Sequence, residues 1–389
     1  MHSKKRVFIT GYGSVNAVSM DNLGDRDAGV KLARHAPCLP LEELNEQEYA
    51  RHNITRRMDR FSLLAYIATC KAIANAAIER PMLANDRSGI VMNTCFGPLD
   101  STRRYMAKLI RDGAKKVPAA VFPNTVHNAF TGLITMELGL HGSNSTVSGQ
   151  NPVCYGFDMI HQGNDDLMIV GGCDELLPAI KSGFDLAGYT SGSDSGASVF
   201  DRHGGQFYLG EGAAVLVLES EESMARRDAA PLAEILNYGM ANGLSGSACE
   251  AFPHDTTAIV TALRQSLARS GIAASDVDYI SAASNGVARV AGAEIDALHT
   301  VFDGPAGPIV GNVKSLLGET LGGASVFSTI FALDVLRNGS APPIHGLAAG
   351  LLPPHFVAHQ PRSAQFEIAL VNAFELGGCC TSLALRRTH

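Results

Sequence analysis

The stretch VGNVKSLLGETLGGA, residues 310–324, decides which fold this chain is expected to adopt. Its start belongs to an apolar run over residues 309–313 that is typical of a short buried strand. A glycine-containing loop that carries Lys314 follows the strand. The next apolar segment predicts a helix over residues 324–338 that ends at Gly339, because glycine readily adopts the left-handed conformation of a helix C-terminus. This order of strand, loop and buried helix is typical of layered α/β proteins.

The same alternation continues from this stretch toward both ends of the chain. The strands are short and lack a clean alternation of polar and apolar residues, which predicts a sheet covered on both faces. The pattern restarts after residue 220, so we expect two α/β halves, residues 1–220 and 221–389, packed as one body. The other predicted strands cover residues 6–10, 88–93, 167–170, 213–219, 232–237, 278–283, 365–372 and 381–386, and the other predicted helices cover residues 60–78 and 256–270, the latter ending at Gly271.

Glycines and one aspartate mark the expected ends of several elements. Gly11 and Gly13 are expected to end the first strand in a turn, and Gly171 with Gly172 to end the strand over residues 167–170. Asp59 is expected to cap the N-terminus of the helix that follows it, since a carboxylate can accept hydrogen bonds from the free N–H groups there.

Composition and charge exclude several classes of function. The 389 residues are 46% hydrophobic, enough for a large buried core, and the net charge is −7. Lys and Arg are scattered, without the concentrated basic stripe that nucleic-acid binding needs. No window approaches the ~20 apolar residues of a membrane span, and the first apolar run is too short for a signal peptide. The eight cysteines lack the spacing of metal ligands, so we expect free thiols in a soluble cytoplasmic protein.

Eight segments, in order and over nearly the whole chain, resemble the β-ketoacyl-carrier-protein synthases, which are condensing enzymes of the thiolase fold. Each segment alone is weakly specific, but eight in the right order are a strong signal. The segments are RVFITGYGSVNAV (6–18), MDRFSLLAYIATCKAIANAAI (58–78), FPNTVHNAFTGLI (122–134), LMIVGGCDE (167–175), FDRHGGQFYLGEGAAVLVLE (200–219), VGNVKSLLGETLGGA (310–324), APPIHG (341–346) and VNAFELGG (371–378). The resemblance implies a thiolase-like fold with a duplicated, five-layered αβαβα architecture, and a dimer built by pairing an edge strand across a two-fold or pseudo-two-fold axis.

The condensation performed by active members needs a thiolate and two imidazoles, supplied by three separate segments. The first histidine should follow the strand over residues 278–283, where this chain has Ala283. The second should lie in the loop after Lys314, where this chain has Glu319. A methyl group carries no proton, and a carboxylate at neutral pH would repel a forming enolate. The residues that flank both positions match the family clearly, so the resemblance implies a site without either histidine.

The position of the nucleophile lies in GSNSTVSGQNPVCYGFD, residues 142–158. Counting forward from Gly142 places Asn151 at the family's cysteine. A slip of one residue places Gln150 there. Glutamine is the residue that chain-length factors, the non-catalytic relatives of these synthases, often carry at this site. Cys154, three residues after Asn151, is either a reactive thiol or a buried and inert one. The sequence alone decides neither whether Gln150 or Asn151 occupies the cysteine position nor whether the Cys154 thiol is reactive.

Other positions of the family pattern also bear on function. The loop lysine, Lys314, either pairs with Glu319 or is a solvated or structural residue. Glu375 and Leu376 replace the usual Gly-Phe gate, which suggests relaxed demands on acyl access. The segment over residues 122–134 borders the polyketide tunnel in chain-length factors, with ordinary interface packing as the alternative. The tunnel or interface candidates in this segment are Phe122, Thr125, His127, Asn128 and Phe130.

The degenerate site most resembles that of chain-length factors, the ketosynthase β subunits of type II polyketide synthases. We therefore expect a non-catalytic subunit that forms a heterodimer with an active ketosynthase α subunit, shapes the polyketide tunnel and meets an acyl carrier protein. It is expected to need no cofactor and no metal. The alternatives are a malonyl-carrier-protein decarboxylase that supplies acetyl primers, an acyltransferase that depends on Cys154, and a scaffold without a tunnel. Aromatic and polyene pathways both use such pairs.

Overall fold

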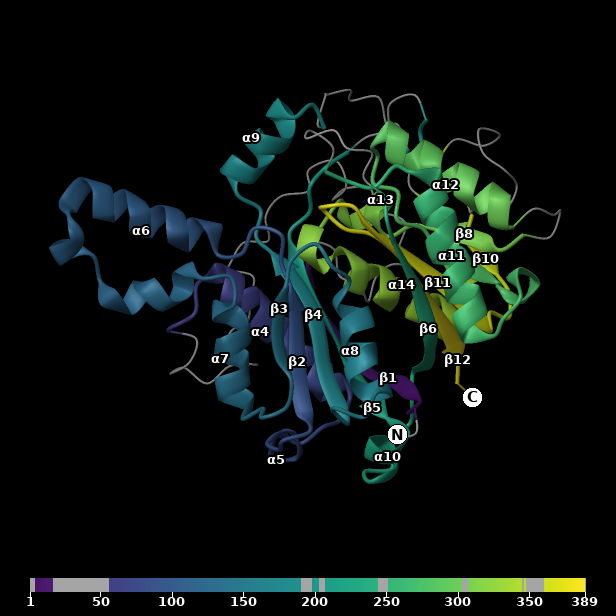
Figure 1. Ribbon diagram of the computed structural model, residues 1–389, viewed down its shortest axis with the longest axis horizontal. Helices are drawn as coiled ribbons and strands as arrows, with labels where there is room; N and C mark the ends of the chain where they lie inside the picture. Colours follow the sequence, from purple (N-terminus) through teal and green to yellow (C-terminus); the bar gives the residue numbers. More distant parts are fainter. Residues whose placement is uncertain are drawn as a thin grey trace.

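A ten-stranded sheet runs through the molecule in the order β3-β2-β4-β5-β1-β6-β12-β11-β7-β8 (Figure 1). The first five of these strands come from residues 7–220, and the last five come from residues 233–387. The two sets join where β1 pairs with β6, with Val7 opposite Ile235 and Ile9 opposite Ala233. The computed structural model describes residues 4–16, 56–189, 198–202, 207–243, 251–302, 307–344, 346–347 and 360–388.

The elements have the following bounds. The strands are β1 (Val7–Asn16), β2 (Ser88–Asn93), β3 (Asn144–Val147), β4 (Leu167–Asp174), β5 (Gly212–Ser220), β6 (Ala233–Asn242), β7 (Tyr279–Ser281), β8 (Ile309–Gly311), β9 (Ser340–Ala341), β10 (Arg362–Ser363), β11 (Ile368–Phe374) and β12 (Cys379–Arg387). The α-helices are α4 (Arg60–Asn75), α5 (Arg80–Leu83), α6 (Leu99–Asp112), α7 (Ala129–Leu138), α8 (Pro152–His161), α9 (Pro178–Leu186), α10 (Glu221–Ala225), α11 (Thr256–Ser270), α12 (Ala288–Val301), α13 (Lys314–Leu317) and α14 (Ala324–Asn338). Short 3-10 helices are η3 (Ala114–Lys116), η4 (Ala119–Thr125), η5 (Ala274–Asp276) and η6 (Leu321–Gly323).

Alternating side chains of the strands divide the core into layers. On β5, Leu216 joins a central core with α8 and α14, while Val215 joins an outer core with α4 and α7. On β11, Val371 faces the same central core, while Leu370 joins an outer core with α11 and α12. Each fully buried side chain of this size contributes roughly 1.5–3 kcal/mol. The order of layers is therefore α, β, α, β, α, the duplicated thiolase-like architecture that was predicted, and Figure 1 shows the two outer helix pairs on opposite sides.

Three predicted helix ends are confirmed. The Asp59 carboxylate accepts a hydrogen bond of 2.9 Å from the backbone N–H of Ser62 and so caps α4. Helices α11 and α14 cover the predicted residues and end at Gly271 and Gly339, whose φ angles of 65° and 63° are left-handed. These ends could be predicted because a cap residue is a local signal in the sequence.

The predicted end of the first strand was wrong, because β1 continues through both of its glycines to Asn16. A Cβ at Gly11 would lie 2.5 Å from Ala76 Cβ, and one at Gly13 would lie 2.4 Å from the carbonyl oxygen of Ala68. The missing side chains therefore allow α4 to pack directly on the strand. Here glycine serves a close approach between two elements and not a turn.

The predicted end of the strand over residues 167–170 was also wrong, since β4 continues through Gly171 and Gly172 to Asp174. A Cβ at Gly172 would lie only 1.9 Å from the carbonyl oxygen of Gly322. The glycine lets the loop before α14 approach the central strand of the N-terminal half. This contact brings the segment that decides the fold next to the end of β4.

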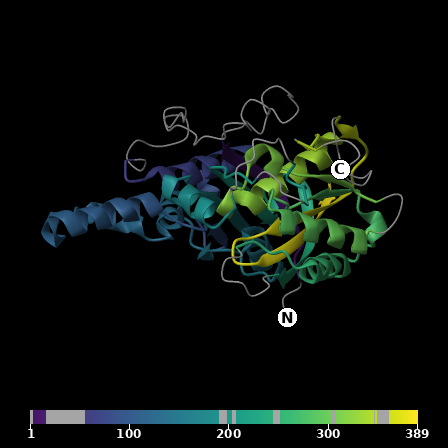
Figure 2. The same cartoon turned by 90° about the horizontal axis from the view of Figure 1, so that it is seen from above.

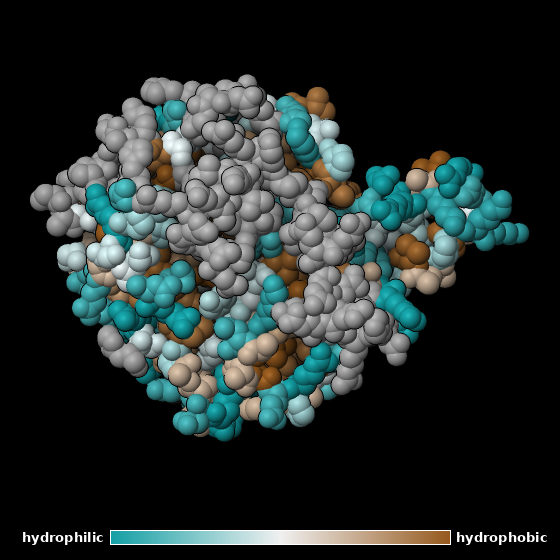
Figure 3. All heavy atoms as spheres, turned by 180° about the vertical axis from the view of Figure 1, so that it is seen from behind, coloured by the Kyte–Doolittle hydropathy of each residue, from teal (hydrophilic) through white to brown (hydrophobic). Residues whose placement is uncertain are grey.

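An arm formed by residues 99–125 stands out from the body and contains α6, η3 and η4 (Figures 1 and 2). None of the residues in these three helices is buried within this chain. Large apolar side chains are nevertheless exposed along the arm and at α7, where Figure 3 shows hydrophobic surface on the projecting part. They are Met106, Ile110, Val121, Phe122, Val126 and Met136. No helix was predicted over residues 99–112.

Candidate functional site

The loops that carry Ala283 and Glu319 lie side by side. The Asn285 side chain donates from Nδ2 to Glu319 Oε2 at 3.0 Å. From the other loop, Asn312 Nδ2 donates to the carbonyl oxygens that flank Ala283, at 3.2 Å and 2.8 Å. The fold therefore brings together two of the three segments on which the family's chemistry depends, although they are separated by more than 30 residues.

Ala283 follows β7 and is completely buried. Its backbone N–H donates to Glu294 Oε1 at 2.9 Å, and the N–H and hydroxyl of Ser284 donate to Glu294 Oε2 at 2.8 and 2.6 Å. Asn372 Nδ2 on β11 donates to Glu294 Oε1 at 3.0 Å. The Glu294 carboxylate on α12 thus fixes the loop from behind, while the Ala283 side chain offers no proton. Sequence reasoning missed Glu294 because a glutamate within an alanine-rich helix carries no local signal.

Glu319 forms a buried ion pair with Lys314. The Lys314 ammonium donates to Glu319 Oε2 at 2.8 Å, and the two side chains are only 3% and 1% exposed. The second oxygen, Oε1, accepts the backbone N–H of Leu321 at 3.0 Å. Because both oxygens are engaged, the carboxylate is held in place and its charge is balanced by the lysine. The Lys314 ammonium is therefore not left free to stabilise negative charge on a reacting thioester.

Asn151 occupies the N-cap of α8, and the exposed Gln150 precedes it. The Asn151 Oδ1 atom accepts the backbone N–H of Val153 at 3.0 Å, and Nδ2 donates to Thr381 Oγ1 on β12 at 2.9 Å. Both ends of the amide are therefore used within the chain. Pro152 opens the helix behind the cap, which suits a position whose N–H has no partner inside the helix.

Cys154 is the third residue of α8, and it is buried together with Asn151, Pro152 and Val153 before it. Its side chain is 2% exposed and belongs to the central core. Burial, with smaller effects from Cys379 and Asp158, raises the pKa of the Cys154 thiol well above its usual range. A nucleophile must be a thiolate, so this geometry favours the inert thiol among the two alternatives.

Glu375 is a further buried carboxyl of this site. It lies at the end of β11, is 2% exposed, and accepts a hydrogen bond of 3.3 Å at Oε2 from Asn93 Nδ2. Within the described residues its Oε1 has no hydrogen-bond partner, and neither do Asn93 Oδ1 and Ser325 Oγ. Burial, above all, raises the pKa of Glu375 to about 8, and the nearby Glu319 charge acts in the same direction.

The five tunnel or interface candidates are not gathered at one place. Phe130 on α7 is fully buried, and its ring packs against Phe61 of α4 at 4.5 Å between centroids. Phe122 is 56% exposed on the arm, where its ring lies 5.7 Å from that of Tyr105. Thr125 is half-buried at the end of η4, and His127 and Asn128 are exposed. Phe130 therefore packs in the core of this chain, whereas the other four residues lie at or near its surface.

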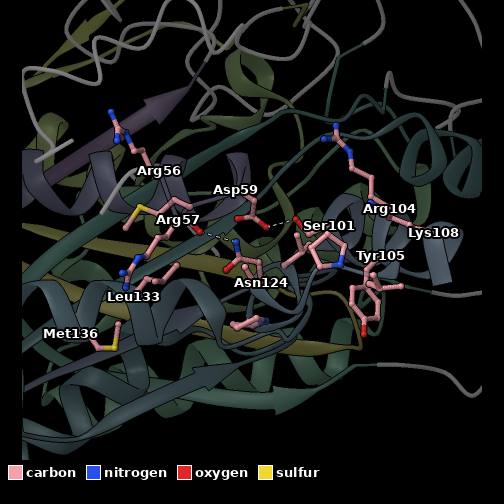
Figure 4. Close-up of a pocket in the computed structure, with 16 residues that line it drawn as sticks. Arg56, Arg57, Asp59, Ser101, Arg104, Tyr105, Lys108, Asn124, Leu133 and Met136 are labelled. Carbon is pink, nitrogen blue, oxygen red and sulfur yellow. Dashed lines mark hydrogen bonds between the residues drawn. The ribbon is translucent and has the colours of Figure 1, made fainter. Parts of the chain in front are cut away.

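A pocket of about 900 Å³ lies where the arm meets the body (Figure 4). Four cationic side chains line it, and Asp59 is the acidic residue among its lining. The carboxylate of Asp59 already accepts the Ser101 hydroxyl at 2.6 Å. Arg104 also pairs with Asp100, at 2.6 Å. The cations are Arg56, Arg57, Arg104 and Lys108, and apolar walls are supplied by Met58, Val117, Val121, Leu133 and Met136.

The sequence did not reveal this basic pocket because its cations come from two separate stretches. Arg56 and Arg57 precede α4, whereas Arg104 and Lys108 lie on α6.

In the described part of the chain, no group of three or more His, Cys, Asp or Glu side chains is arranged to hold a metal ion. The helices that the structure describes include none long and apolar enough to cross a membrane.

The five-layered fold, with a site where loops of both halves meet, defines a protein of the thiolase-like ketosynthase class. The chain belongs to the β-ketoacyl synthase family. The N-terminal domain of that family matches residues 31–224, and its C-terminal domain matches residues 232–348.

Several proteins of known sequence are similar to this chain. Nodulation protein E of Rhizobium sp. (strain N33) is 28% identical over 353 residues, which cover 86% of this chain and 85% of that protein. The 3-oxoacyl-[acyl-carrier-protein] synthase 2 of Staphylococcus aureus (strain COL) is 26% identical over 374 residues, or 89% of each chain. The sequence relatives are thus dominated by ordinary condensing enzymes.

Two solved structures share the fold over the full chain. The structure described as the ishigamide ketosynthase/chain length factor aligns with a TM-score of 0.82 and 22% identity, covering 100% of both chains. A type II polyketide synthase acyl-carrier protein in complex with its ketosynthase aligns with a TM-score of 0.83 and 18% identity, covering 99% of this chain and 100% of that one.

Proposed function

We propose that this chain is a non-catalytic ketosynthase-like subunit of the chain-length-factor type, which acts beside an active ketosynthase in polyketide assembly. The observation that carries this proposal is the pair of replacements at the two imidazole positions, Ala283 and Glu319. Ala283 supplies no proton, and Glu319 is consumed by its ion pair with Lys314. Loss of one oxyanion donor typically costs ~10²–10³ in rate, so the loss of two leaves little condensation.

The two enzymatic alternatives receive less support from the geometry. An acyltransferase that depends on Cys154 would need an accessible thiolate, but that thiol is buried with a raised pKa. A decarboxylase would need donors for the enolate oxygen, but the Asn151 amide is engaged by Val153 and Thr381. We infer that neither activity belongs to this chain.

The proposed ketosynthase partner has a suitable surface to bind. β3 is the last strand on one side of the sheet, so its outer edge is unpaired among the described strands. The arm beside it exposes apolar side chains, of which Ile110 is 80% and Phe122 is 56% exposed. An unpaired strand edge next to exposed apolar surface favours association with another chain. We propose that a ketosynthase α subunit pairs along β3 and covers the part of the arm around Ile110 and Phe122, which do not line the pocket where the arm meets the body.

The proposed acyl carrier partner has a suitable surface as well. Acyl carrier proteins bring an acidic surface, and the pocket at the base of the arm presents Arg56, Arg57 and Lys108 beside apolar walls. Complementary charge at such a patch speeds encounter and orients the partner, although the whole chain carries a net charge of −7. We propose that the carrier meets the heterodimer at this pocket.

The experiment that tests the proposal is co-expression of this chain with a candidate ketosynthase α subunit from the same organism, followed by purification through a tag on one subunit. We expect a one-to-one complex that elongates malonyl units, and loss of the product when the active-site cysteine of the ketosynthase is replaced. The chain alone should release no CO₂ from malonyl-carrier protein. A stable homodimer of this chain that condenses or decarboxylates by itself would refute the proposal.

A further inference from the structure

The turn between β11 and β12, residues 375–378, lies over the N-terminus of α8. A Cβ at Gly149 would lie 2.4 Å from the carbonyl oxygen of Leu376, so the turn is in direct contact with the segment before the N-cap. The turn is closed by hydrogen bonds from the Glu375 N–H to the Cys379 oxygen and from the Gly378 N–H to the Glu375 oxygen, at 2.9 and 3.0 Å. Its position is therefore well defined.

The Glu375 side chain extends from this turn into the interior and meets residues of three other segments. Asn93 at the end of β2 donates to it at 3.3 Å. Ser325, near the start of α14, and Lys314 are close enough to lower its pKa against the effect of burial. Asn93 Nδ2 also donates to the carbonyl oxygen of Gly322, at 3.0 Å, so Glu375 and the loop that follows Glu319 share one donor. The carboxyl thus lies beside the loop that follows Glu319, and its own turn contacts the segment before α8.

We propose that the Glu375 side chain closes this chain's own acyl-binding space, by filling the volume between the N-terminus of α8 and the Glu319 carboxylate. This inference goes beyond the proposed function, because a chain could lack both histidines and still accept an acyl group. Glycine is the usual residue at this position in the family that the sequence resembles. The replacement by glutamate adds a side chain that is 2% exposed where glycine has none.

The charge balance of the site fits a closing group that is neutral. Lys314 is the cation of this cluster, and Glu319 already neutralises it at 2.8 Å. A second ionised carboxylate would be buried without a counter-ion, which is costly. The protonated carboxyl has nearly the shape of a glutamine side chain, so it fills the space without an unpaired charge. Closure in this form prevents the silent subunit from competing with its partner for acyl groups.

The test uses a thiol introduced at the closed site. Asn151→Cys places a cysteine at the N-cap of α8, where the helix N-terminus favours the thiolate. Three variants are compared. The first carries Asn151→Cys alone, the second carries Asn151→Cys with Glu375→Gly, and the third carries Asn151→Cys with Glu375→Gln as the control of equal size. Each is treated with an iodoacetamide that carries an octyl chain, and labelling at residue 151 is followed by peptide mass spectrometry.

We expect the octyl reagent to label the variant with Glu375→Gly roughly tenfold faster or more than the other two, since access and not thiol chemistry differs. Equal rates in all three variants, or a fast rate with Glu375→Gln, would overturn the proposal. If the glycine variant fails to fold, Glu375→Ala replaces it, and failure of both would assign Glu375 to stability instead of closure. Co-purification with the ketosynthase is scored separately, so the proposed function can hold while the closure fails.

Discussion

At the scale of single residues, the site is built from charges that satisfy each other and not from groups left free for a substrate. Lys314 neutralises Glu319, Glu294 fixes the loop of Ala283, and Asn151 caps α8. Apart from Glu375, Asn93 and Ser325, each of which has one buried polar atom without a partner among the described residues, these groups are engaged and the site is chemically quiet. The consequences for stability can be measured one residue at a time.

Replacement of Lys314 by methionine should destabilise the protein by about 3–5 kcal/mol, because it leaves the Glu319 carboxylate buried without its cation. The midpoint of urea unfolding measures this loss. The matched control adds Glu319→Gln, which removes the charge but keeps an amide that can accept the Leu321 N–H. The double variant should recover most of the lost stability, and equal midpoints for the single and double variants would count against a buried ion pair.

Glu375 should make the stability of the protein fall as the pH rises. Its pKa is raised to about 8 in the folded state, whereas an unfolded glutamate titrates near 4.3. Between these values the folded state holds a proton that the unfolded state has released, so each pH unit costs up to about 1.4 kcal/mol. Below this window both states are protonated, and above it both are ionised, so the slope should vanish at either end.

The variant Glu375→Gln keeps the shape of the protonated side chain and should remove this slope. The measurement is the free energy of unfolding from urea titrations at pH values between 5.5 and 8.5, for the variant and the parent protein (roughly the window set by the two pKa values). A parent protein whose stability does not change more steeply with pH than that of the variant would show that Glu375 is ionised when folded.

At the scale of elements, close approach between backbones sets the arrangement of the layers. Gly11 and Gly13 admit α4, and Gly172 admits the loop before α14. These contacts explain how α4 packs directly on β1 and how the loop before α14 reaches β4. Outside these packed layers, the arm leaves apolar residues such as Ile110 and Phe122 exposed.

Gly172→Ala should destabilise the protein by about 1–3 kcal/mol or more, because the new Cβ would lie 1.9 Å from the Gly322 oxygen and neither backbone can move easily. Gly292→Ala on α12 is the matched control, since a Cβ there meets no atom within 4 Å. The control should be stabilised by up to about 1 kcal/mol through helix propensity. Thermal unfolding of both variants distinguishes steric conflict from a general effect of glycine replacement, and an undisturbed Gly172→Ala protein would contradict the close approach.

Charges placed on the arm should abolish heterodimer formation without affecting the fold. Ile110→Glu with Phe122→Glu puts two carboxylates on surface that the partner is proposed to cover. Leu186→Glu on α9 is the control, because Leu186 is 91% exposed and belongs to a helix outside the arm. Size-exclusion chromatography of the co-expressed pair should show separate subunits for the arm variant and an intact complex for the control. Retention of the complex by the arm variant would place the interface elsewhere.

At the scale of the whole molecule, the fold gathers charge that the sequence keeps apart. Arg56 and Lys108 lie 52 residues apart in the chain yet line one pocket. A net charge of −7 therefore coexists with a local basic surface. Recognition of an acidic partner depends on this local surface and not on the total.

Reversal of two charges in the pocket should weaken carrier binding. Arg56→Glu with Arg57→Glu is expected to raise the Kd for the acyl carrier protein roughly tenfold or more, mainly at low ionic strength where screening is weak. Arg337→Glu, an exposed residue at the end of α14, is the control for a change in net charge. Surface plasmon resonance of the heterodimer at two salt concentrations measures the effect, and equal affinities for all variants would exclude the pocket as the docking site.

The parts of the molecule that could be predicted from sequence are those with local signals. Gly271 and Gly339 marked the ends of α11 and α14, and the restart of the pattern indicated two α/β halves, whose boundary at residue 220 stays a prediction. Gly11 was misread because a glycine that admits a helix looks like a glycine that makes a turn. The helix α6 was not predicted, and none of its residues is buried in the described part of the chain.

The candidate site, too, could be predicted only in part. Ala283 and Glu319 could be located because the residues around them match the family, and the structure brings their loops together. The occlusion by Glu375, the support from Glu294 and the basic pocket depend on contacts between distant segments. Such contacts are set by packing of whole elements, and no window of sequence contains them.

The unpaired edge of β3 has a consequence for how cells must produce this protein. A strand edge that no other described strand pairs with, beside exposed apolar side chains, can add a strand from any neighbour, including another copy of the same chain. Synthesis of the two subunits in equal amounts and at the same time would cover the edge as soon as it forms. Under the proposed pairing, a chain made in excess would be prone to aggregate, so the ratio of the two translation rates would set how much of this protein survives.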